Sequence, residues 1–176
     1  MALSFEESLC SILVKNEVIS SQEAHELQKD FKGRSKENFD DFLLTEGLVS
    51  KEDLLQALSE YYDVPSFDVI GHFFDRDLLH RFPYDVLIRY EVIPLERDGN
   101  MVAIVASDPR KIENAQEVTQ CLSEDFHFFV GIRRDIVDAV DAYYEASPFT
   151  SDGEIDQTEE EQDEIEAFED VLDDSQ

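Results

Sequence analysis

The sequence predicts an α+β fold in which a duplicated helical-hairpin half, residues 1–63, is followed by a small mixed sheet with packing helices, residues 64–146. Three observations support this: apolar spacing that repeats at an offset of 30 residues, a hairpin with an Asp-Gly turn, and an apolar strand followed by a helical pattern and another strand. We expect the two halves to form one module, followed by a disordered acidic tail at 147–176.

The predicted sheet centres on residues 91–107. Arg97-Asp98-Gly99-Asn100 separates the apolar runs 92–95 and 101–106. Asp-Gly between two such runs is a strong hairpin signal, because glycine tolerates the positive φ of tight hairpin turns. The run 101–106 has no polar alternation, which is typical of a central strand buried on both faces. Pro94 has no N–H to donate, so it places the first run at an edge or a bulge.

A βαβ unit is predicted next. Asp108 suits an N-cap and Pro109 a first helical turn, where a missing N–H costs nothing. One apolar face predicts a single crossover helix: Ile112, Ala115, Val118 and Leu122. Residues 126–130 should form a strand parallel to 101–106, because a helical connection usually joins neighbouring parallel strands. A last helix is expected around 136–144, with order ending near 147–148.

The first sixty residues predict four short helices made by a duplication. Seven positions correspond: Leu9, Ile12, Leu13, Val14, Val18, Ile19 and Ser20 match Phe39, Phe42, Leu43, Leu44, Leu48, Val49 and Ser50. Gly47 fits the left-handed end of the third helix, whereas Glu17, its counterpart in the first copy, would be strained there.

Local signals complete the expected elements. Ser4 with Glu7 and Ser20 with Glu23 have capping-box spacing, in which side chain and backbone satisfy each other's hydrogen bonds. A short strand at 66–69 and two short helices at 75–80 and 84–90 are expected before the hairpin.

The charge of the chain is extreme, with 43 acidic against 14 basic residues. Thirteen of the acids lie in 152–176, which contains no Lys or Arg, so the part before it has 30 acids against 14 bases and a net charge of −16. Such a field repels phosphate backbones and anionic lipid, and we expect neither nucleic-acid binding nor membrane-surface binding. No apolar run reaches membrane-spanning length and no secretory signal begins the sequence. We expect a cytoplasmic protein in which Cys10 and Cys121 are reduced and buried.

Two segments suggest contacts with other molecules. One basic cluster, Lys29, Lys32, Arg34 and Lys36, is either a solvated loop or a contact for an anion or an acidic partner. In the acidic tail, Ile165, Phe168 and Leu172 are spaced as one helical stripe that could fold against a partner groove. A purely solubilising tail is the alternative.

No catalytic, metal or cofactor site is predicted. The six glycines never cluster into a phosphate-binding loop, and the four histidines lack the short spacing of a zinc site. Carboxylates are so numerous that no pair stands out as an acid and base. We therefore expect a protein that is not an enzyme.

The duplicated helices, residues 54–65 (LLQALSEYYDVP), residues 92–95 (VIPL) and residues 105–109 (VASDP) together resemble the N-terminal domain of GspE/PilB/MshE-type secretion and pilus-assembly ATPases. The resemblance spans about residues 5–144. It implies an α+β module that docks the motor of those ATPases onto the cytoplasmic part of a membrane assembly platform. It also implies that some members bind cyclic di-GMP through the duplicated motif.

Two departures from the family pattern limit what carries over. The ATPase part with its phosphate-binding loop is missing from the sequence. The Arg-Leu-Gly openings of ligand-binding copies are replaced by Ser8-Leu9-Cys10 and Asn38-Phe39-Asp40, which removes the guanidinium and adds a carboxylate that repels phosphate.

The function expected from the resemblance is a non-catalytic protein-interaction module whose partner is a cytoplasmic component of a secretion or pilus apparatus. A diverged cyclic di-GMP receptor is the alternative, with five candidate residues left from the family pattern: Leu9, Leu13, Phe39, Leu43 and Gly47. Because the openings are lost, we expect cyclic di-GMP not to bind.

Overall fold

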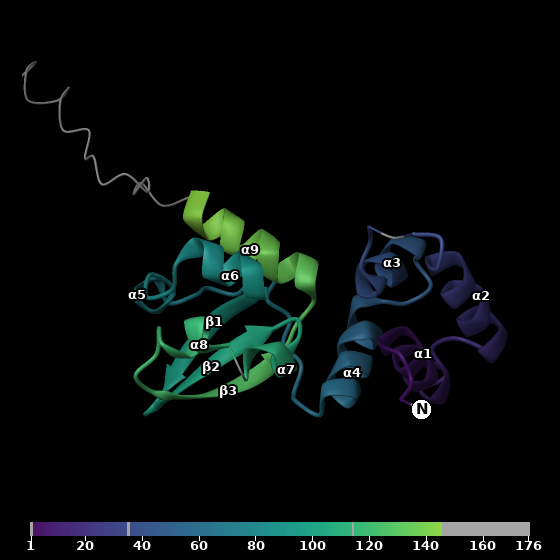
Figure 1. Cartoon of the computed structure of the whole chain (residues 1–176), viewed down its shortest axis with the longest axis horizontal. Coiled ribbons are helices and arrows are strands. Elements are labelled where there is room, and N and C mark those ends of the chain that lie inside the picture. The colour runs from purple at the N-terminus through teal and green to yellow at the C-terminus, as the bar shows by residue number, and fades with distance from the viewer. Residues whose placement is uncertain (1, 35, 114, 146–176) are drawn as a thin grey trace, which may run out of the picture. The chain divides into compact units, whose positions relative to one another are not determined.

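The computed structural model describes residues 2–34, 36–113 and 115–145 (Figure 1). Residues Met1–Tyr144 form one compact unit. The predicted acidic tail, with Ile165, Phe168 and Leu172, lies outside the described residues. The boundaries predicted at 63/64 and 146/147 remain predictions.

The first half consists of four helices, as the duplication predicts: α1 (Phe5–Lys15), α2 (Ser21–Phe31), α3 (Phe39–Glu46) and α4 (Lys51–Tyr62). The apolar faces of these helices bury one cluster, in which five side chains are 0% exposed: Leu9, Leu13, Phe42, Leu43 and Leu54. At about 25 cal/mol per Å² of buried apolar surface, this cluster is the main source of stability for this half.

The predicted caps of α1 and α2 are confirmed. The Ser4 hydroxyl accepts from the Glu7 N–H at 3.2 Å, and the Glu7 carboxylate accepts from the Ser4 N–H at 3.0 Å. Ser20 and Glu23 form the same reciprocal pair at 3.2 and 2.7 Å. Each cap satisfies two amide donors that the helix leaves unpaired, and losing one costs about 1 kcal/mol.

The ends of α1 and α3 show how the two copies have diverged. Gly47 ends α3 with φ of 72°, where an L side chain is strained. Glu17 takes φ of 60° at the matching position of the first copy. The same backbone turn is therefore kept in both copies, and the first copy makes it without glycine.

The sheet has three strands in the order β1-β2-β3: β1 (Val92–Asp98), β2 (Met101–Ala106) and β3 (Asp125–Val130). β1 and β2 pair as the predicted hairpin, with Asp98 opposite Met101 and Gly99 at φ of 61° in the turn. The register shifts between Pro94 and Glu96, so the strand with proline is an edge strand with a bulge, as predicted. β3 lies parallel to β2, which confirms the central position of β2.

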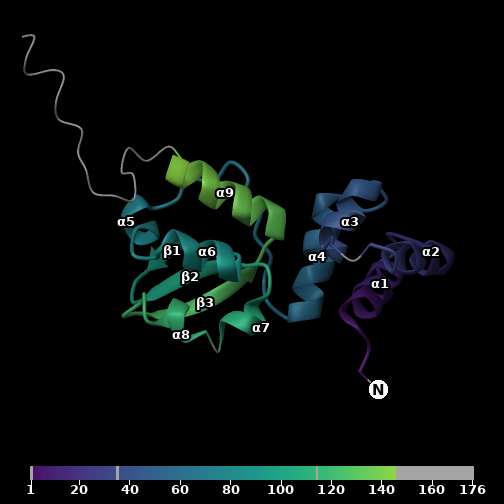
Figure 2. The ribbon, with the colours of Figure 1, turned by 45° about the horizontal axis from the view of Figure 1, so that its top comes forward.

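Helices pack against this sheet and share one hydrophobic core with it. In Figure 2, α6 (Tyr84–Tyr90) is drawn over the strands, α9 (Arg133–Glu145) above them, and α7 (Pro109–Ile112) and α8 (Gln116–Thr119) below them. The short α5 (Arg76–Leu79) contacts β1. β2 is the central strand, and every one of its residues except Met101 is buried.

The prediction of a single crossover helix is wrong. Asp108 caps α7 and Pro109 is its first residue, as expected, but α7 ends at Ile112. Ala115 has extended backbone (φ −84°, ψ 96°) and begins α8. Ile112, Ala115 and Val118 are still buried, so the apolar spacing indicated burial correctly and helix continuity incorrectly.

The strand predicted at 66–69 is also wrong. Ser66 makes one isolated bridge with Val130, and the Phe67 N–H donates to the Val130 carbonyl at 2.9 Å. The Asp68 carboxylate then accepts from the Ile70 N–H at 3.0 Å. This local turn diverts the chain from the sheet after one bridge.

Cys10 is buried and Cys121 is half-buried, and both are free thiols. Within the part of the chain that the structure describes, no helix combines the length and the apolar content needed to cross a bilayer.

The element order and the sheet topology confirm the predicted α+β class. A helical half is followed by a mixed three-stranded sheet with packing helices.

Candidate functional site

The candidate site is a groove of about 260 Å³ where the second helical copy meets the end of the sheet. We call it the joint groove. Its polar and aromatic lining includes side chains from the start of α3, from α4, the strand ends, α7 and α9: Asn38, Asp40, Tyr61, Tyr62, Glu91, Ser107, Arg110 and Arg133.

The sheet topology brings the polar groups of this groove together. β2 and β3 are parallel, so their carboxyl ends share an edge, and the Gly131 N–H donates to the Ala106 carbonyl at 3.0 Å. Ser107 follows β2 and Arg133 follows β3, so both emerge at that edge. Ligands of open α/β sheets commonly bind outside the carboxyl ends of strands, so this end of the sheet is a candidate ligand site.

Arg133 holds the centre of the joint groove. Its Nη2 donates to the Asp41 carboxylate at 2.6 Å, and its Nη1 lies 3.4 Å from the Glu91 carboxylate. With its amide oxygen turned toward Arg133, Asn38 accepts from Nη2 at 3.0 Å and from Nε at 2.8 Å. The guanidinium thus ties the opening of α3 to the start of α9 and to the residue before β1.

Glu91 and Ser107 extend this network across the sheet edge. The Ser107 hydroxyl donates to the Glu91 carboxylate at 2.6 Å, and the Ser107 N–H donates to the Glu91 carbonyl at 3.1 Å. Glu91 has φ of 52°, in the left-handed region. A backbone conformation of this kind persists only where surrounding contacts hold it. We infer that the contacts with Ser107 and Arg133 fix the position of the Glu91 carboxylate.

The Asp40 carboxyl in the groove has a raised pKa. Burial, and next the charge of Asp41, raises the pKa of Asp40 from 3.8 to about 6. Backbone N–H groups at Asp41 and Asp40 and the charge of Arg133 oppose this rise without cancelling it. At neutral pH Asp40 is still mostly ionised, but its charge is less stable in the folded protein than in water.

The aromatic wall of the groove is covered by Arg110. Its guanidinium carbon lies 4.7 Å from the ring centre of Tyr61 and 5.3 Å from that of Tyr62. Its Nη2 also donates to the Tyr61 carbonyl at 3.0 Å. Burial raises the pKa of Tyr62, so this phenol stays neutral. Both rings thus make cation–π contacts with the Arg110 guanidinium.

The predicted ligand residues take structural positions. Leu9, Leu13, Phe39 and Leu43 are at most 3% exposed in the helical core, and Gly47 ends α3. Their assignment to a ligand remains a prediction. The structure instead brings Asn38 and Asp40, from the altered opening of the second copy, into the groove. Sequence reasoning missed Arg133, for which the available signal was a basic residue soon after a buried strand.

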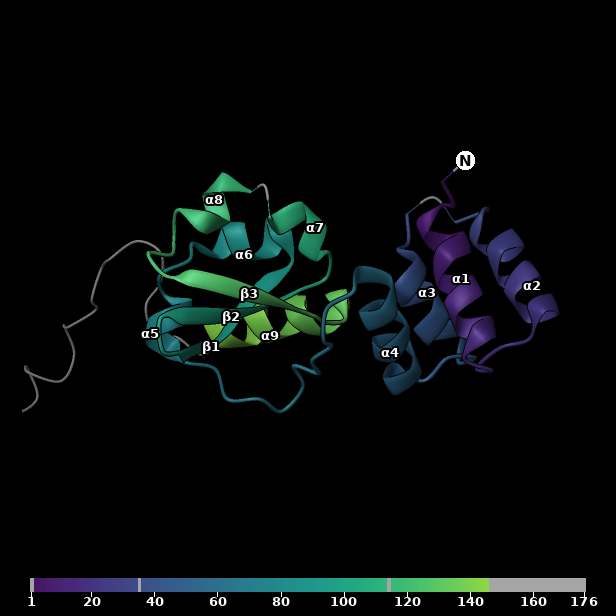
Figure 3. The same cartoon turned by 90° about the horizontal axis from the view of Figure 1, so that it is seen from below.

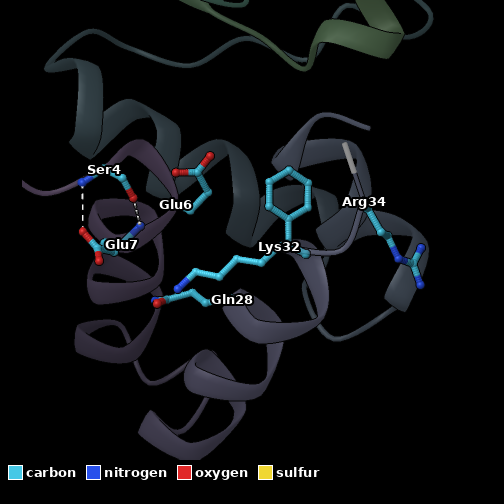
Figure 4. Close-up of a pocket in the computed structure, with 7 residues that line it drawn as sticks. Ser4, Glu6, Glu7, Gln28, Lys32 and Arg34 are labelled. Atoms are coloured by element: carbon cyan, nitrogen blue, oxygen red, sulfur yellow. Dashed lines mark hydrogen bonds between the residues drawn. The ribbon is translucent and has the colours of Figure 1, made fainter. Parts of the chain in front are cut away.

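A second cavity of about 440 Å³ lies beside α1 and α2 (Figure 4). Lys32 extends toward Gln28 across it, whereas Arg34 points away from the other labelled side chains. Arg34 pairs with Glu37 at 3.3 Å and Glu46 at 3.2 Å. Of the predicted basic cluster, Arg34 is thus used in ion pairs within the fold, and Lys32 lines the cavity.

A metal site would need at least three ligand side chains close together. Across residues 2–34, 36–113 and 115–145, no three His, Cys, Asp or Glu side chains are grouped so as to hold an ion.

The sequence is similar to a known domain family and to a pilus assembly ATPase. Residues 72–149 match the family described as the MshEN domain. A type IV pilus assembly ATPase, PilB of Myxococcus xanthus (strain DK1622), is 23% identical over 136 residues, which are 77% of this chain and 24% of PilB. The chain therefore spans about a quarter of the length of this relative.

Two solved structures have the same fold. A structure of MshE with cdg has a TM-score of 0.61 and 23% identity, and the match covers 77% of this chain and 98% of that one. The N-terminal domain of XpsE has a TM-score of 0.55 and 17% identity, and the match covers 80% and 97%. The predicted resemblance is thus confirmed: the chain contains an MshEN-domain match and has the fold of the N-terminal domains of secretion and pilus-assembly ATPases.

Proposed function

We propose that this chain is a non-catalytic interaction module that docks onto a protein component of a secretion or pilus apparatus. The observation that carries the proposal is the internal pairing of the joint groove, at the place where the fold would offer a ligand site. The likeness to domains of secretion and pilus-assembly ATPases supports a partner that belongs to a secretion or pilus apparatus.

The cations and aromatic faces of the groove already have partners within the protein. A cyclic dinucleotide needs cations for its phosphates and flat faces for its bases. Arg133 is held by Asp41, Glu91 and Asn38, and Arg110 covers the faces of Tyr61 and Tyr62. A ligand would have to break these contacts before making its own. The proposal is therefore that the groove joins the two halves of the module.

The second candidate function is that of a diverged cyclic di-GMP receptor. It is favoured by the fold shared with the structure of MshE with cdg and by the two guanidinium groups and two tyrosine rings that line the groove. In this case ligand binding would exchange the internal partners of Arg110 and Arg133 for phosphate and base.

Calorimetric titration with cyclic di-GMP separates the two candidates. For the interaction module we expect no saturable binding tighter than about 100 μM, which corresponds to roughly −5.5 kcal/mol. The N-terminal domain of MshE, titrated in parallel, controls for ligand quality. Saturable micromolar binding that is lost in Arg110→Ala would overturn the module proposal in favour of the receptor.

Docking itself is tested with purified cytoplasmic segments of the membrane assembly platforms of the source organism. We expect saturable binding of at least one segment without any nucleotide. The stripe Ile165, Phe168 and Leu172 is proposed as one contact, so Phe168→Ala should weaken binding by about 1 to 3 kcal/mol. Ile155→Ala, an apolar change in the same tail outside the stripe, is the matched control. Equal binding by both variants would remove the stripe from the proposal.

A further inference from the structure

The segment between α4 and α5 displays an apolar side chain that the fold does not use. Phe73 is 96% exposed, the highest value among the exposed large apolar residues of the described chain, and Ile70 in the same loop is 56% exposed. Figure 3 shows this segment looping away from the sheet before it reaches α5. A single exposed apolar residue is ordinary, but a fully exposed phenylalanine close to a second apolar residue needs an explanation.

The loop that carries Phe73 is held in place by its neighbours. The His72 ring makes edge contacts with Phe67 at 5.2 Å and with Phe74 at 4.9 Å, and Phe67 contacts Phe129 of β3 at 5.9 Å. The His72 N–H also donates to the carbonyl of buried Val69 at 3.3 Å. Alternate residues are therefore anchored, and Phe73 is presented to solvent from an ordered backbone. An anchor that is already ordered loses less entropy on binding.

The charges around the loop define what it can meet. Asp68, Asp75 and Asp77 flank it. Lys51 lies 4.0 Å from the Asp68 carboxylate, and the guanidinium of Arg76 lies over the Tyr143 ring at 5.7 Å. The Asp75 carboxylate accepts from the Asp77 N–H at 3.0 Å, which fixes its position at the start of α5. The loop is thus an apolar tip with an acidic rim.

We propose that Phe73 and Ile70 are the anchors by which the module docks into an apolar pocket rimmed by Lys or Arg on its protein partner. This inference rests on the proposed function and names the surface that would perform it. A second copy of the chain would bring like charges together, since the sequence carries 43 acids against 14 bases. An anionic membrane would be repelled by the same rim. The complementary occupant is therefore a basic protein surface.

Site-specific photo-crosslinking tests the surface. Phe73 is replaced by the photoreactive p-benzoyl-phenylalanine, and Met101, which is 40% exposed in the hairpin, is replaced in the same way as the control. The probes are the purified platform segments used for the docking assay and vesicles containing 30% anionic lipid. We expect an adduct from position 73 with a segment, at a peptide in which Lys or Arg flanks apolar residues. Excess parent protein should compete it away, Phe73→Trp nearly as well, and Phe73→Ser about tenfold less well.

The outcomes separate this inference from the function on which it depends. If a segment binds but Phe73→Ser competes as well as the parent, docking stands and the loop is not the contact. If no segment binds, both proposals fail. An adduct with a second copy of the chain, or retention on vesicles that Phe73→Ser abolishes, would overturn the basic protein partner.

Discussion

Replacing Asp40 with Asn should make the protein more stable at neutral pH. Asp40 is partly buried at the opening of α3, and burial together with Asp41 raises its pKa from 3.8 to about 6. Asparagine has nearly the same shape and keeps an oxygen that can accept from the backbone N–H groups nearby. The change therefore removes the charge with little change in packing.

The magnitude follows from the pKa. An acid whose pKa is higher in the folded than in the unfolded state binds its proton more tightly when folded, so the free energy of unfolding falls as pH rises from about 4 to about 6. The difference between 3.8 and about 6 corresponds to about 3 kcal/mol, at about 1.36 kcal/mol per pH unit. The N-terminus of α3 favours a negative charge by about 0.3 to 1 kcal/mol, which asparagine gives up. We expect a net gain of about 2 kcal/mol at pH 7.5 and almost none at pH 4.

Urea denaturation followed by circular dichroism at pH 4 and pH 7.5 measures both values. Asp41→Asn is the matched control, because Asp41 pairs with Arg133 at 2.6 Å and its removal should destabilise the protein at pH 7.5. Adjacent carboxylates are thus expected to give opposite signs. An Asp40→Asn variant no more stable than the parent at pH 7.5, or equally stabilised at both pH values, would refute the reasoning.

Three further predictions concern the fold. Ile104→Asp puts a charge at a position that is 1% exposed and should cost several kcal/mol by urea denaturation, whereas Ile70→Asp, at an exposed site, should cost little. Gly131→Ala places a Cβ 2.6 Å from Val105 Cγ1, so overpacking should lower the free energy of unfolding by about 1 to 3 kcal/mol. Removing residues 150–176 should leave the melting temperature nearly unchanged, since that sequence has few apolar residues to bury; a large drop, or resistance to limited proteolysis, would contradict this.

The parts of the fold that the sequence predicted are those with local causes. The Ser4 and Ser20 caps depend on residues three positions apart, and the hairpin depends on a turn of a few residues. The two errors share one origin. Apolar spacing at 112–122 indicates which side chains are buried, but neither that spacing nor the short run at 66–69 fixes the backbone hydrogen bonds. Ala115 breaks the first pattern and Asp68 the second by bonding to the Ile70 N–H.

The joint groove could not be predicted in the same way, because its contacts are remote in the sequence. Arg133 and Asp41 are 92 positions apart, and Arg133 and Glu91 are 42 apart. The sequence did predict that β2 and β3 are parallel, from which a shared carboxyl edge follows. It could not predict that the opening of α3 would reach that edge, since this depends on how the helical half packs against Val130 and Ile132.

The position of Asp40 connects the lost ligand motif with the joint. In the resemblance, glycine would occupy this position and arginine that of Asn38. Here Asn38 turns its amide oxygen to Arg133, and Asp41 pairs with the same guanidinium. The opening of the second copy has therefore become a set of acceptors for a cation that α9 supplies, the reverse of an arginine that would reach out to phosphate. Under the module proposal, an acceptor-rich opening attracts Arg133 and should repel an anionic ligand, which is the outcome that titration with cyclic di-GMP tests.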